Sequence, residues 1–358
     1  MTDKKDIFGP KTMVSAAIDA KILQSEPDMD SLRGKNVLIT GGAGGLGKAM
    51  AERYIAAGAN VTIGDLDVTN GEKLARTNRA LEFKKCNVLS WDDQKDLFEF
   101  AYNRFSGLDI VVANAGVTER GFSCTDDLEK PGLFTLNINL QAQFYTAKLA
   151  HYYLRRNPKG VNRDRVLLLT GSMASVGEIP GAPEYTASKH GMLGLMRSLR
   201  RTAPSDDIRV NSIHPWFVET GIIDEGVKLL LAGTRYANIE DVVRAVMILS
   251  TEKVNGRALA IMAPDVGVVD LFPSDDTVGD FQVFTDRVAH AFGLRNRALA
   301  RVSYVKDWVK QVSHLVWRTG KLPLLAFLLT LAYRKRKSPY VQIKLMEMVQ
   351  KYHELRGN

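Results

Sequence analysis

The chain has 358 residues, of which 45% are hydrophobic and 25% charged, a composition that excludes disordered, collagen-like and disulfide-rich classes. The net charge of +8 is confined to one end, because residues 274–358 hold 15 Lys and Arg against 7 Asp and Glu. The two cysteines, Cys86 and Cys124, are too few for a disulfide framework, and the first residues contain no long apolar signal segment. We therefore expect a cytoplasmic protein.

Short apolar, β-branched runs alternate with helical stretches along most of the chain. The runs typical of buried strands lie at 36–40, 60–63, 80–83, 109–113, 165–170, 209–213 and 258–262. The helical stretches lie at 48–57, 91–105, 133–154, 185–202 and 239–251. Strands that alternate with helices form parallel βαβ units, and right-handed crossovers place the helices on both faces of the sheet. The sequence therefore predicts an α/β fold with a doubly wound, Rossmann-type parallel sheet.

We divide the chain into a lead-in at 1–33, a Rossmann-type domain at 34–273 and a basic, mostly helical C-terminal extension at 274–358. Within the extension, segment 321–337 has an apolar run of 12 residues followed by Arg334-Lys335-Arg336-Lys337. At 1.5 Å per residue the run covers about 18 Å, which is too short for a hydrocarbon core of about 30 Å. Two roles stay open for this segment: packing on the main domain or a partner subunit, or peripheral contact with a membrane surface.

A glycine-rich turn, Gly41–Gly47, stands between the first predicted strand and the first predicted helix. Glycines let the backbone approach a pyrophosphate closely, and the free N–H groups of a helix start attract phosphate. The turn therefore predicts a dinucleotide site that uses Gly41, Gly45, Leu46 and Gly47. A flexible surface turn is the alternative.

Asp65 ends the second predicted strand, 18 residues after Gly47. An acid at this position accepts hydrogen bonds from the hydroxyls of the adenosine ribose and repels a 2′-phosphate. The next residue, Leu66, is not basic. The sequence therefore favours NAD, with NADP as the alternative.

Tyr185 and Lys189 are four residues apart at the start of a predicted helix, so both side chains share one face. An ammonium group near a phenol lowers the pKa of the phenol, which makes a usable acid and base for a hydroxyl or carbonyl substrate. The same spacing recurs at Tyr333 and at Tyr340, but only Tyr185 has a serine 13 residues upstream, which is Ser172.

Together these motifs resemble the short-chain dehydrogenase/reductase superfamily over about residues 33–265. Its motifs occur here in order as Thr40-Gly41-x-x-x-Gly45-x-Gly47, Asn114-Ala115-Gly116, Asn139, Ser172 and Tyr185-x-x-x-Lys189. The 15-hydroxyprostaglandin dehydrogenase-like subgroup looks nearest, because of Asp65 and the context of Tyr185. The resemblance implies that Tyr185 is the catalytic acid and base, that Lys189 binds the nicotinamide ribose, that Ser172 holds the substrate oxygen and that Asn139 holds a water of the proton relay.

The resemblance also implies a set of residues that line the cofactor. Besides the glycine turn and Asp65, this set is Asn87, Val88, Asn114, Ala115, Gly116, Tyr185, Lys189, Pro215, Val218 and Thr220. The chain departs from the family where Asn87 replaces an aspartate and Trp216 replaces a glycine. We expect little loss from Asn87. Trp216 either shapes the substrate pocket or packs away from it.

The resulting prediction is an oxidoreductase that transfers a hydride between a nicotinamide cofactor and a secondary alcohol or ketone. The loop at 220–238 is rich in Ile, Val and Leu, which suggests a fairly apolar substrate. The alternatives are an NADPH-dependent ketoreductase in a biosynthetic pathway and a membrane-tethered scaffold with a non-catalytic nucleotide fold. The resemblance suggests a homo-oligomer. We expect no specific nucleic-acid partner, and no metal, because no histidines and acids have ligand spacing.

Overall fold

The computed structural model describes residues 18–120, 128, 130–157, 164–220 and 231–272. The chain divides into two compact units, Met1–Gly293 and Leu294–Asn358. Every described residue belongs to the first. The predicted helical extension at 274–358, with its segment 321–337, lies outside the described residues. The division into three parts therefore stays a prediction.

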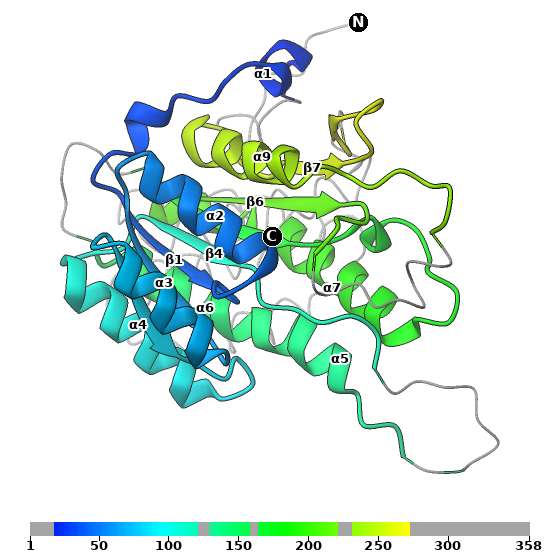
Figure 1. Cartoon of the computed structure of the whole chain (residues 1–358), viewed down its shortest axis with the longest axis horizontal. Coiled ribbons are helices and arrows are strands. Elements are labelled where there is room, and N and C mark those ends of the chain that lie inside the picture. The colour runs from blue at the N-terminus through cyan, green and yellow to red at the C-terminus, as the bar shows by residue number, and fades with distance from the viewer. Residues whose placement is uncertain (1–17, 121–127, 129, 158–163, 221–230, 273–358) are drawn as a thin grey trace, which may run out of the picture. The chain divides into compact units, whose positions relative to one another are not determined.

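Eight strands form one sheet in the order β3-β2-β1-β4-β5-β6-β7-β8 (Figure 1). The strands are β1 (Asn36–Thr40), β2 (Asn60–Asp65), β3 (Leu81–Lys85), β4 (Ile110–Ala113), β5 (Arg165–Thr170), β6 (Ile208–Pro215), β7 (Ala258–Ile261) and β8 (Val268–Asp270). The first seven run parallel, whereas β8 pairs antiparallel with β7. The predicted doubly wound parallel sheet is confirmed. The edge strand β8 was not predicted, because three residues carry no periodicity.

Within the described residues the helices are α1 (Ala20–Gln24), α2 (Gly45–Ala56), α3 (Val68–Thr77), α4 (Trp91–Phe105), α5 (Phe134–Leu136), α6 (Ala142–Leu154), α7 (Pro183–Leu199) and α9 (Ile239–Thr251). Shorter helical turns are η1 (Met29–Leu32), η2 (Asn137–Gln141), η3 (Met173–Ser175) and η4 (Ala203–Asp206). Helices α2 and α9 pack into one hydrophobic cluster with the sheet, and α4, α6 and α7 pack into a second. Helices therefore cover both faces.

The predicted helix 133–154 is built from three consecutive pieces. Helix α5 leads into η2, a π-helical turn in which the Ala142 N–H bonds to the carbonyl of Asn137, and α6 follows. Helix α3 was not predicted, because its sequence contains Thr, Asn and Gly, which favour other structures. An added Cβ at Gly71 of α3 would lie 2.2 Å from the Phe83 ring, so this glycine allows α3 to pack on β3.

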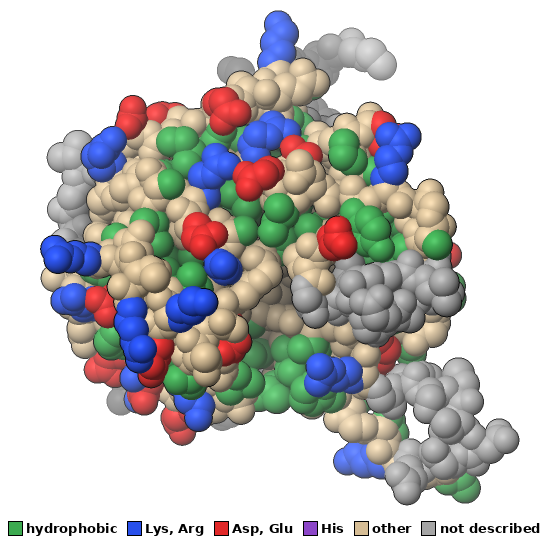
Figure 2. Space-filling model, in the orientation of Figure 1, with side chains coloured by type: hydrophobic (Ala, Val, Ile, Leu, Met, Phe, Trp, Pro, Cys, Tyr) green, Lys and Arg blue, Asp and Glu red, His purple; other side chains and the backbone are tan. Residues whose placement is uncertain are grey.

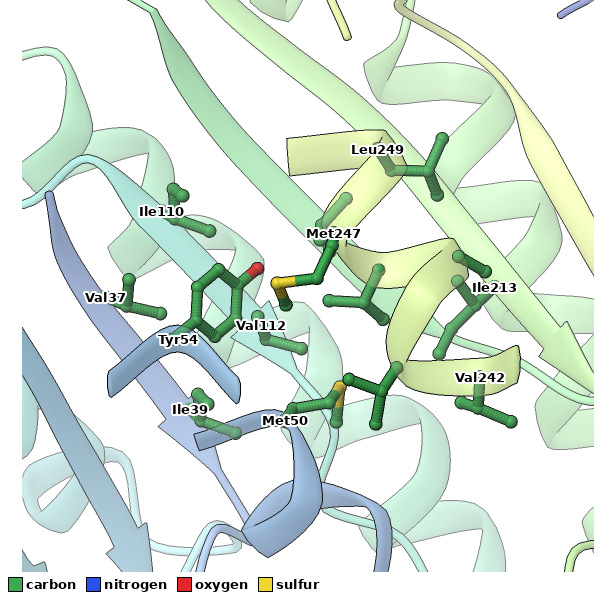
Figure 3. Packing of buried hydrophobic residues seen from close by; sticks show 14 of the residues in the cluster. Val37, Ile39, Met50, Tyr54, Ile110, Val112, Ile213, Val242, Met247 and Leu249 are labelled. Atoms are coloured by element: carbon green, nitrogen blue, oxygen red, sulfur yellow. The ribbon is translucent and has the colours of Figure 1, made fainter. Parts of the chain in front are cut away.

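The cluster under α2 and α9 is continuous with the middle of the sheet (Figure 3). Met50 and Tyr54 of α2 lie on the same side of the sheet as Met247 of α9, and side chains from β1, β4 and β6 complete the cluster. Burial of each such side chain contributes about 1.5–3 kcal/mol. The hydroxyl of Tyr54 is satisfied inside this cluster, because it shares a 2.6 Å hydrogen bond with Ser250 Oγ. The lead-in also contributes to this cluster, through Ile18, Leu23 and Leu32.

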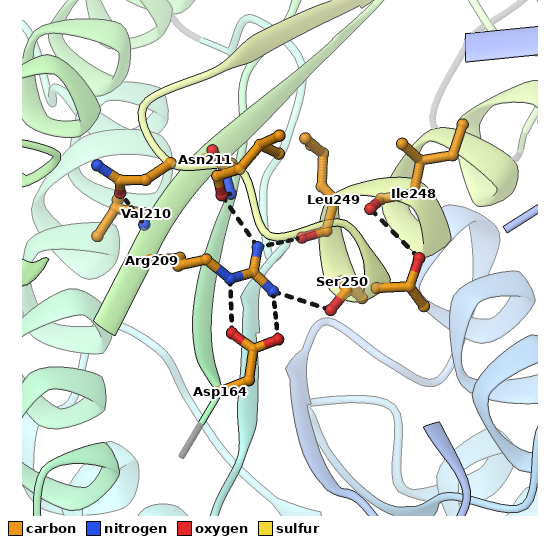
Figure 4. A network of polar contacts seen from close by, with 10 residues as sticks. Asp164, Arg209, Val210, Asn211, Ile248, Leu249 and Ser250 are labelled. Atoms are coloured by element: carbon orange, nitrogen blue, oxygen red, sulfur yellow. Dashed lines mark hydrogen bonds and ion pairs between the residues drawn. The ribbon is translucent and has the colours of Figure 1, made fainter. Parts of the chain in front are cut away.

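Arg209 ties the start of β6 to the end of α9 (Figure 4). Its guanidinium makes two hydrogen bonds to Asp164, at 2.6 and 3.0 Å, and donates to the carbonyls of Leu249, Val254 and Ser250. A partly buried ion pair contributes only when its remaining groups are satisfied, as they are here. The network stands at the amino end of β6, which leaves the carboxyl end open for a site.

The described surface carries both signs of charge. Figure 2 shows Lys and Arg side chains interspersed with Asp and Glu on the face presented there. Several form ion pairs, such as the exposed pair of Arg76 with Glu72 and the pair of Arg104 with the partly buried Glu82. Of the helices in the described ranges, none is both long and apolar enough to cross a bilayer.

Candidate active site

The glycine turn follows β1 at the point where the strand order reverses. The chain continues from β1 to β2 on one side, and β4 lies on the other, so the carboxyl ends of β1 and β4 form the switch point at which ligands bind in sheets of this kind. Gly41 (φ 69°) and Gly45 (φ 50°) adopt left-handed backbone conformations. An added Cβ at Gly47 would lie 2.0 Å from the Gly41 carbonyl oxygen, so only glycine allows α2 to start this close to the turn.

The turn fits a phosphate group. Gly44 is the N-cap of α2 and offers no side-chain cap to the first amide groups of the helix. An added Cβ at Gly44 would meet no atom within 4 Å, so space is free beside these amides. Uncapped amides at a helix start, with open space before them, are suited to bind the pyrophosphate of a dinucleotide.

Asp65 stands at the end of β2 beside this turn. One carboxylate oxygen accepts from the Ala43 N–H at 2.9 Å, and the other accepts from the Asp67 N–H at 3.1 Å. The carboxylate is therefore held in position before any ligand arrives. Lys85 is the register partner of Asp65 on β3, so a basic residue also lies near this position.

Asn114, Ala115 and Gly116 follow β4 and lie beside the glycine turn. The Asn114 side chain donates to the carbonyls of Thr40 and Gly41, at 3.1 and 3.0 Å, and so fixes the glycine turn. An added Cβ at Gly116 would lie 3.1 Å from Asn139 Oδ1 and 3.7 Å from Lys189 Nζ. The motif after β4 therefore stands between the turn and the predicted catalytic residues.

The structure brings Tyr185, Ser172 and Lys189 together. Ser172 caps the short helix η3 after β5, and its hydroxyl accepts from the Ala174 N–H at 3.2 Å. Lys189 Nζ lies 5.5 Å from the centroid of the Tyr185 ring. Burial raises the pKa of Tyr185, and a hydrogen bond with the Ser172 hydroxyl lowers it in part. The lowering by Lys189 that the spacing predicted is not found: burial raises the pKa of Tyr185, and the group that lowers it in part is Ser172.

Lys189 is almost completely buried, at 4% exposure. Its Nζ donates to the Thr170 carbonyl at 3.2 Å, and Gln143 Nε2 donates to the same oxygen at 3.3 Å. Burial lowers the pKa of Lys189 to about 8. The ammonium group is thus poised to exchange a proton near neutral pH.

Asn139 lies in the π-helical turn η2 and is fully buried. Its side chain accepts from the Val117 N–H and donates to the Val117 carbonyl, both at 2.8 Å. The π-helical turn interrupts the regular hydrogen bonds of the helix at this residue. Asn139 therefore joins the helix to the segment that follows Gly116.

Behind Ser172 lies a buried histidine, His214, to which the sequence analysis assigned no role. His214 Nδ1 lies 3.2 Å from the Ser172 carbonyl, to which it must donate, and its Nε2 lies 2.8 Å from Ser212 Oγ. Burial lowers the pKa of His214 to about 4, so the ring is neutral. Gly171 makes room for the ring, since an added Cβ would lie 2.5 Å from Nδ1.

The other predicted cofactor residues lie at or after the carboxyl ends of the parallel strands. Pro215 ends β6, Val218 is buried, and Thr220 lies 3.8 Å from where a Cβ on Gly45 would stand. Asn87 and Val88 follow β3, and Asn87 Oδ1 accepts from the Leu89 N–H at 3.1 Å.

Trp216, for which two roles were open, packs against the α2 and α9 cluster and meets Phe217 edge-on at 4.9 Å. This packing favours a structural role.

Sequence reasoning missed two acids, Glu119 and Glu184, that contact the start of α7 and α5. No spacing rule points to them, since each reaches its partner across at least 48 residues. Over the described ranges, no group of three or more His, Cys, Asp or Glu residues could hold a metal ion.

Comparisons with known proteins agree with this geometry. The sequence profile of the family described as short chain dehydrogenase matches residues 35–228, more than half of the chain. The chain is 33% identical over 271 residues to 5'-hydroxyaverantin dehydrogenase of Dothistroma septosporum, and the matched residues cover 67% of this chain and 88% of that protein. It is 32% identical over 235 residues to (+)-borneol dehydrogenase 1 of Salvia officinalis, which covers 62% and 88%.

A solved structure shows the same fold. It is the 3-ketoacyl-(acyl-carrier-protein) reductase from Brucella melitensis complexed with NADH, which superposes with a TM-score of 0.59 at 23% identity and covers 65% of this chain and 98% of its own. The family match and the relatives make the chain an oxidoreductase that uses a nicotinamide cofactor on an alcohol or ketone. The chain belongs to the short-chain dehydrogenase/reductase family.

Proposed function

We propose that this chain is an NAD-dependent dehydrogenase of a fairly apolar secondary alcohol. The observation that carries the proposal is the meeting of Tyr185, Ser172 and Lys189 at the sheet edge that also holds the glycine turn. The names of two relatives, a hydroxyaverantin and a borneol dehydrogenase, support a lipophilic alcohol as substrate. Of the predicted apolar loop at 220–238, residues 221–230 lie outside the described residues.

The family resemblance assigns a role to each of these side chains, and the closeness of Tyr185, Ser172 and Lys189 supports that assignment. In alcohol oxidation, Tyr185 takes the hydroxyl proton once it is ionised, while Ser172 holds the substrate oxygen and its hydrogen bond opposes the burial that raises the Tyr185 pKa. A nicotinamide cofactor, which the glycine turn, Asp65 and Lys189 would hold, would supply the hydride acceptor. Lys189, with a water held at Asn139, passes the proton toward solvent, and ketone reduction uses the same residues in reverse.

The preference for NAD rests on Asp65. Its carboxylate is fixed by two backbone N–H groups at the end of β2, where it repels a 2′-phosphate. One observation favours the NADPH-dependent ketoreductase instead: Lys85 is the register partner of Asp65 and could offset that repulsion.

The experiment that tests the proposal measures binding and turnover separately. Titration calorimetry of NAD, NADH, NADP and NADPH against wild type and Asp65→Ala should show tight NAD(H) binding that weakens in the variant. A panel of lipophilic secondary alcohols should then give turnover that Tyr185→Phe lowers by about 10²–10⁴-fold without loss of NADH binding. Preference for NADPH would favour the ketoreductase, and full activity of Tyr185→Phe would contradict the assigned mechanism.

A homo-oligomer, which the family resemblance suggests, also belongs to this proposal. Helices α4 and α6 pack together and expose three large aromatic side chains, Trp91 at 41%, Phe144 at 50% and Tyr152 at 44%. Exposed aromatic residues on one surface are typical of protein contacts. The expected cytoplasmic location and the membrane role of 321–337 stay predictions.

A further inference from the structure

Helix α7, which carries Tyr185 and Lys189, begins without a cap of its own. The N-cap Ala182 makes no side-chain hydrogen bond, and Pro183 at the first position has no N–H group. The Tyr185 N–H at the third position instead donates a hydrogen bond to Glu119 Oε2 at 2.7 Å. Glu119 lies 66 residues earlier, on the segment that follows the cofactor-lining residues Asn114 to Gly116. The start of α7 is therefore capped by another part of the chain.

Helix α5 shows the same arrangement with a second acid. Its N-cap Leu133 has a left-handed backbone (φ 50°) and makes no side-chain cap. Glu184 Oε2 accepts from the N–H groups of Thr135 and Leu136, at 3.1 and 3.2 Å. Glu184 precedes Tyr185 in α7 and is 4% exposed. The two helices thus begin on carboxylates that they do not supply themselves.

Thr135 joins the start of α5 back to the segment that carries Glu119. Its hydroxyl donates to the Thr118 carbonyl at 3.1 Å and accepts from the Arg120 N–H at 2.9 Å, on either side of Glu119. The segment after β4, the start of α5 and the start of α7 are therefore joined in a ring of hydrogen bonds. Tyr185 stands in that ring, between the two acids.

Each carboxylate leaves one of its two oxygens without a partner among the described residues. Glu119 Oε1 and Glu184 Oε1 are both buried without a hydrogen-bond partner in the described part of the chain. A buried polar atom without a partner costs free energy, whereas a carboxylate at a helix start is favourable. What the arrangement provides is a fixed position: Glu119 holds the start of α7 to the segment that comes just after the cofactor-lining residues.

We propose that Glu119 and Glu184 are positioning residues that set where Tyr185 stands relative to Ser172, Lys189 and the cofactor-lining segment. This inference rests on the proposed role of Tyr185 as acid and base. A displacement of about 1 Å in a catalytic group costs about 10²-fold in rate. The rate should therefore depend on the acceptor at Glu119, although this side chain is assigned no contact with the reacting atoms.

The test compares Glu119→Leu, which keeps the side-chain bulk without an acceptor, with Glu119→Gln, which keeps an acceptor oxygen. We expect Glu119→Leu to lower kcat for the best alcohol of the panel by about 10- to 100-fold, with unchanged NADH affinity by fluorescence titration. Because Tyr185 then loses its hydrogen bond with Ser172, the pH midpoint of kcat should move upward. Glu119→Gln should recover most of the lost kcat, and Glu184→Leu should resemble Glu119→Leu.

Glu72→Leu, at an exposed glutamate of α3 that pairs with Arg76, is the matched control and should keep wild-type kcat. If Glu119→Leu does not fold, Glu119→Asp replaces it, since the shorter acid keeps the charge and withdraws the acceptor, and it should also lower kcat. Suppose that Tyr185→Phe loses turnover. The inference is then overturned if Glu119→Leu, or its replacement, keeps the wild-type kcat and the wild-type pH midpoint. If Tyr185→Phe keeps turnover, the proposed function fails first and the inference fails with it.

Discussion

Two parts of the site are built in different ways. The glycine turn between β1 and α2 consists of backbone, and its shape follows from glycines at fixed spacing within seven residues. The edge around Tyr185 consists of side chains from α7, η2, β6 and the segments after β4 and β5, joined over 19 to 66 residues. The first can be read in the sequence, whereas the second exists only after the sheet has formed.

The two parts also differ in their effect on stability. The turn places its polar groups where backbone, water or ligand can satisfy them. The Tyr185 edge buries an ammonium group, holds a neutral histidine and relies on two acids from elsewhere to start its helices. Functional sites commonly depart from the arrangement that would maximise stability. The comparison therefore predicts that removal of the buried ammonium group near Tyr185 raises stability, whereas enlargement of a closely packed glycine in the turn lowers it.

The largest expected effect is a gain of stability in Lys189→Met. Burial holds the pKa of Lys189 at about 8, against 10.5 in the unfolded chain. The unfolded state therefore binds this proton more tightly, which costs about 3 kcal/mol of folding free energy below pH 8. Lys189→Met should therefore be more stable than wild type at pH 7, although it should be inactive. The Thr170 carbonyl keeps a partner in this variant, because Gln143 still donates to it.

Urea unfolding of the cofactor-free protein from pH 7 to 10.5 measures this effect. The advantage of Lys189→Met should shrink from pH 8 to 10.5, as the unfolded lysine loses its proton. Lys48→Met, at an exposed lysine of α2, serves as the control and should show no such trend. A Lys189→Met protein that is less stable than wild type at pH 7 would show that the buried ammonium group carries no such cost.

A second effect of similar size should appear in acid. The pKa of His214 is lowered by burial to about 4, from 6.5 in the unfolded chain. The neutral ring contributes stability above pH 6.5 that is lost as the pH falls through 4, up to about 3 kcal/mol. His214→Leu should be less stable than wild type at pH 7 but should lack this part of the acid dependence.

Thermal melts between pH 7 and 4 compare His214→Leu with His190→Gln, an exposed histidine of α7. His190→Gln should keep the wild-type slope. Parallel slopes for wild type and His214→Leu would exclude His214 as the source of acid sensitivity.

The smallest of the three effects separates two glycines of the same turn. An added Cβ at Gly47 would lie 2.0 Å from the Gly41 carbonyl and 2.8 Å from Asn114 Nδ2, whereas one at Gly44 would meet nothing within 4 Å. Gly47→Ala should cost about 1–3 kcal/mol of unfolding free energy and weaken NADH binding. Gly44→Ala should cost less than about 1 kcal/mol, since only its preference as an N-cap changes. Denaturant midpoints decide this, and equal costs would mean that the turn is not closely packed.

Much of the fold could be predicted because the relevant signals are local. The apolar runs of β1, β4 and β5 and the spacing of Tyr185 and Lys189 fall within single elements. Helix α3 could not be predicted, because its Gly71 is there to contact Phe83 on the next strand. The position of His214 behind Ser172 was equally hidden, since 42 residues and a strand pairing separate them.

The sequence by itself determined the alternation of strands and helices, the glycine turn, the acid that ends β2 and the Tyr185 and Lys189 pair. Each depends on spacing along a few residues, and backbone geometry fixes what that spacing means. Tertiary structure alone decided that burial raises the pKa of Tyr185, that Lys189 is held by the Thr170 carbonyl, and that Glu119 and Glu184 start the helices around them. Burial and the pairing of distant groups set these properties, and neither exists until the sheet brings the segments together.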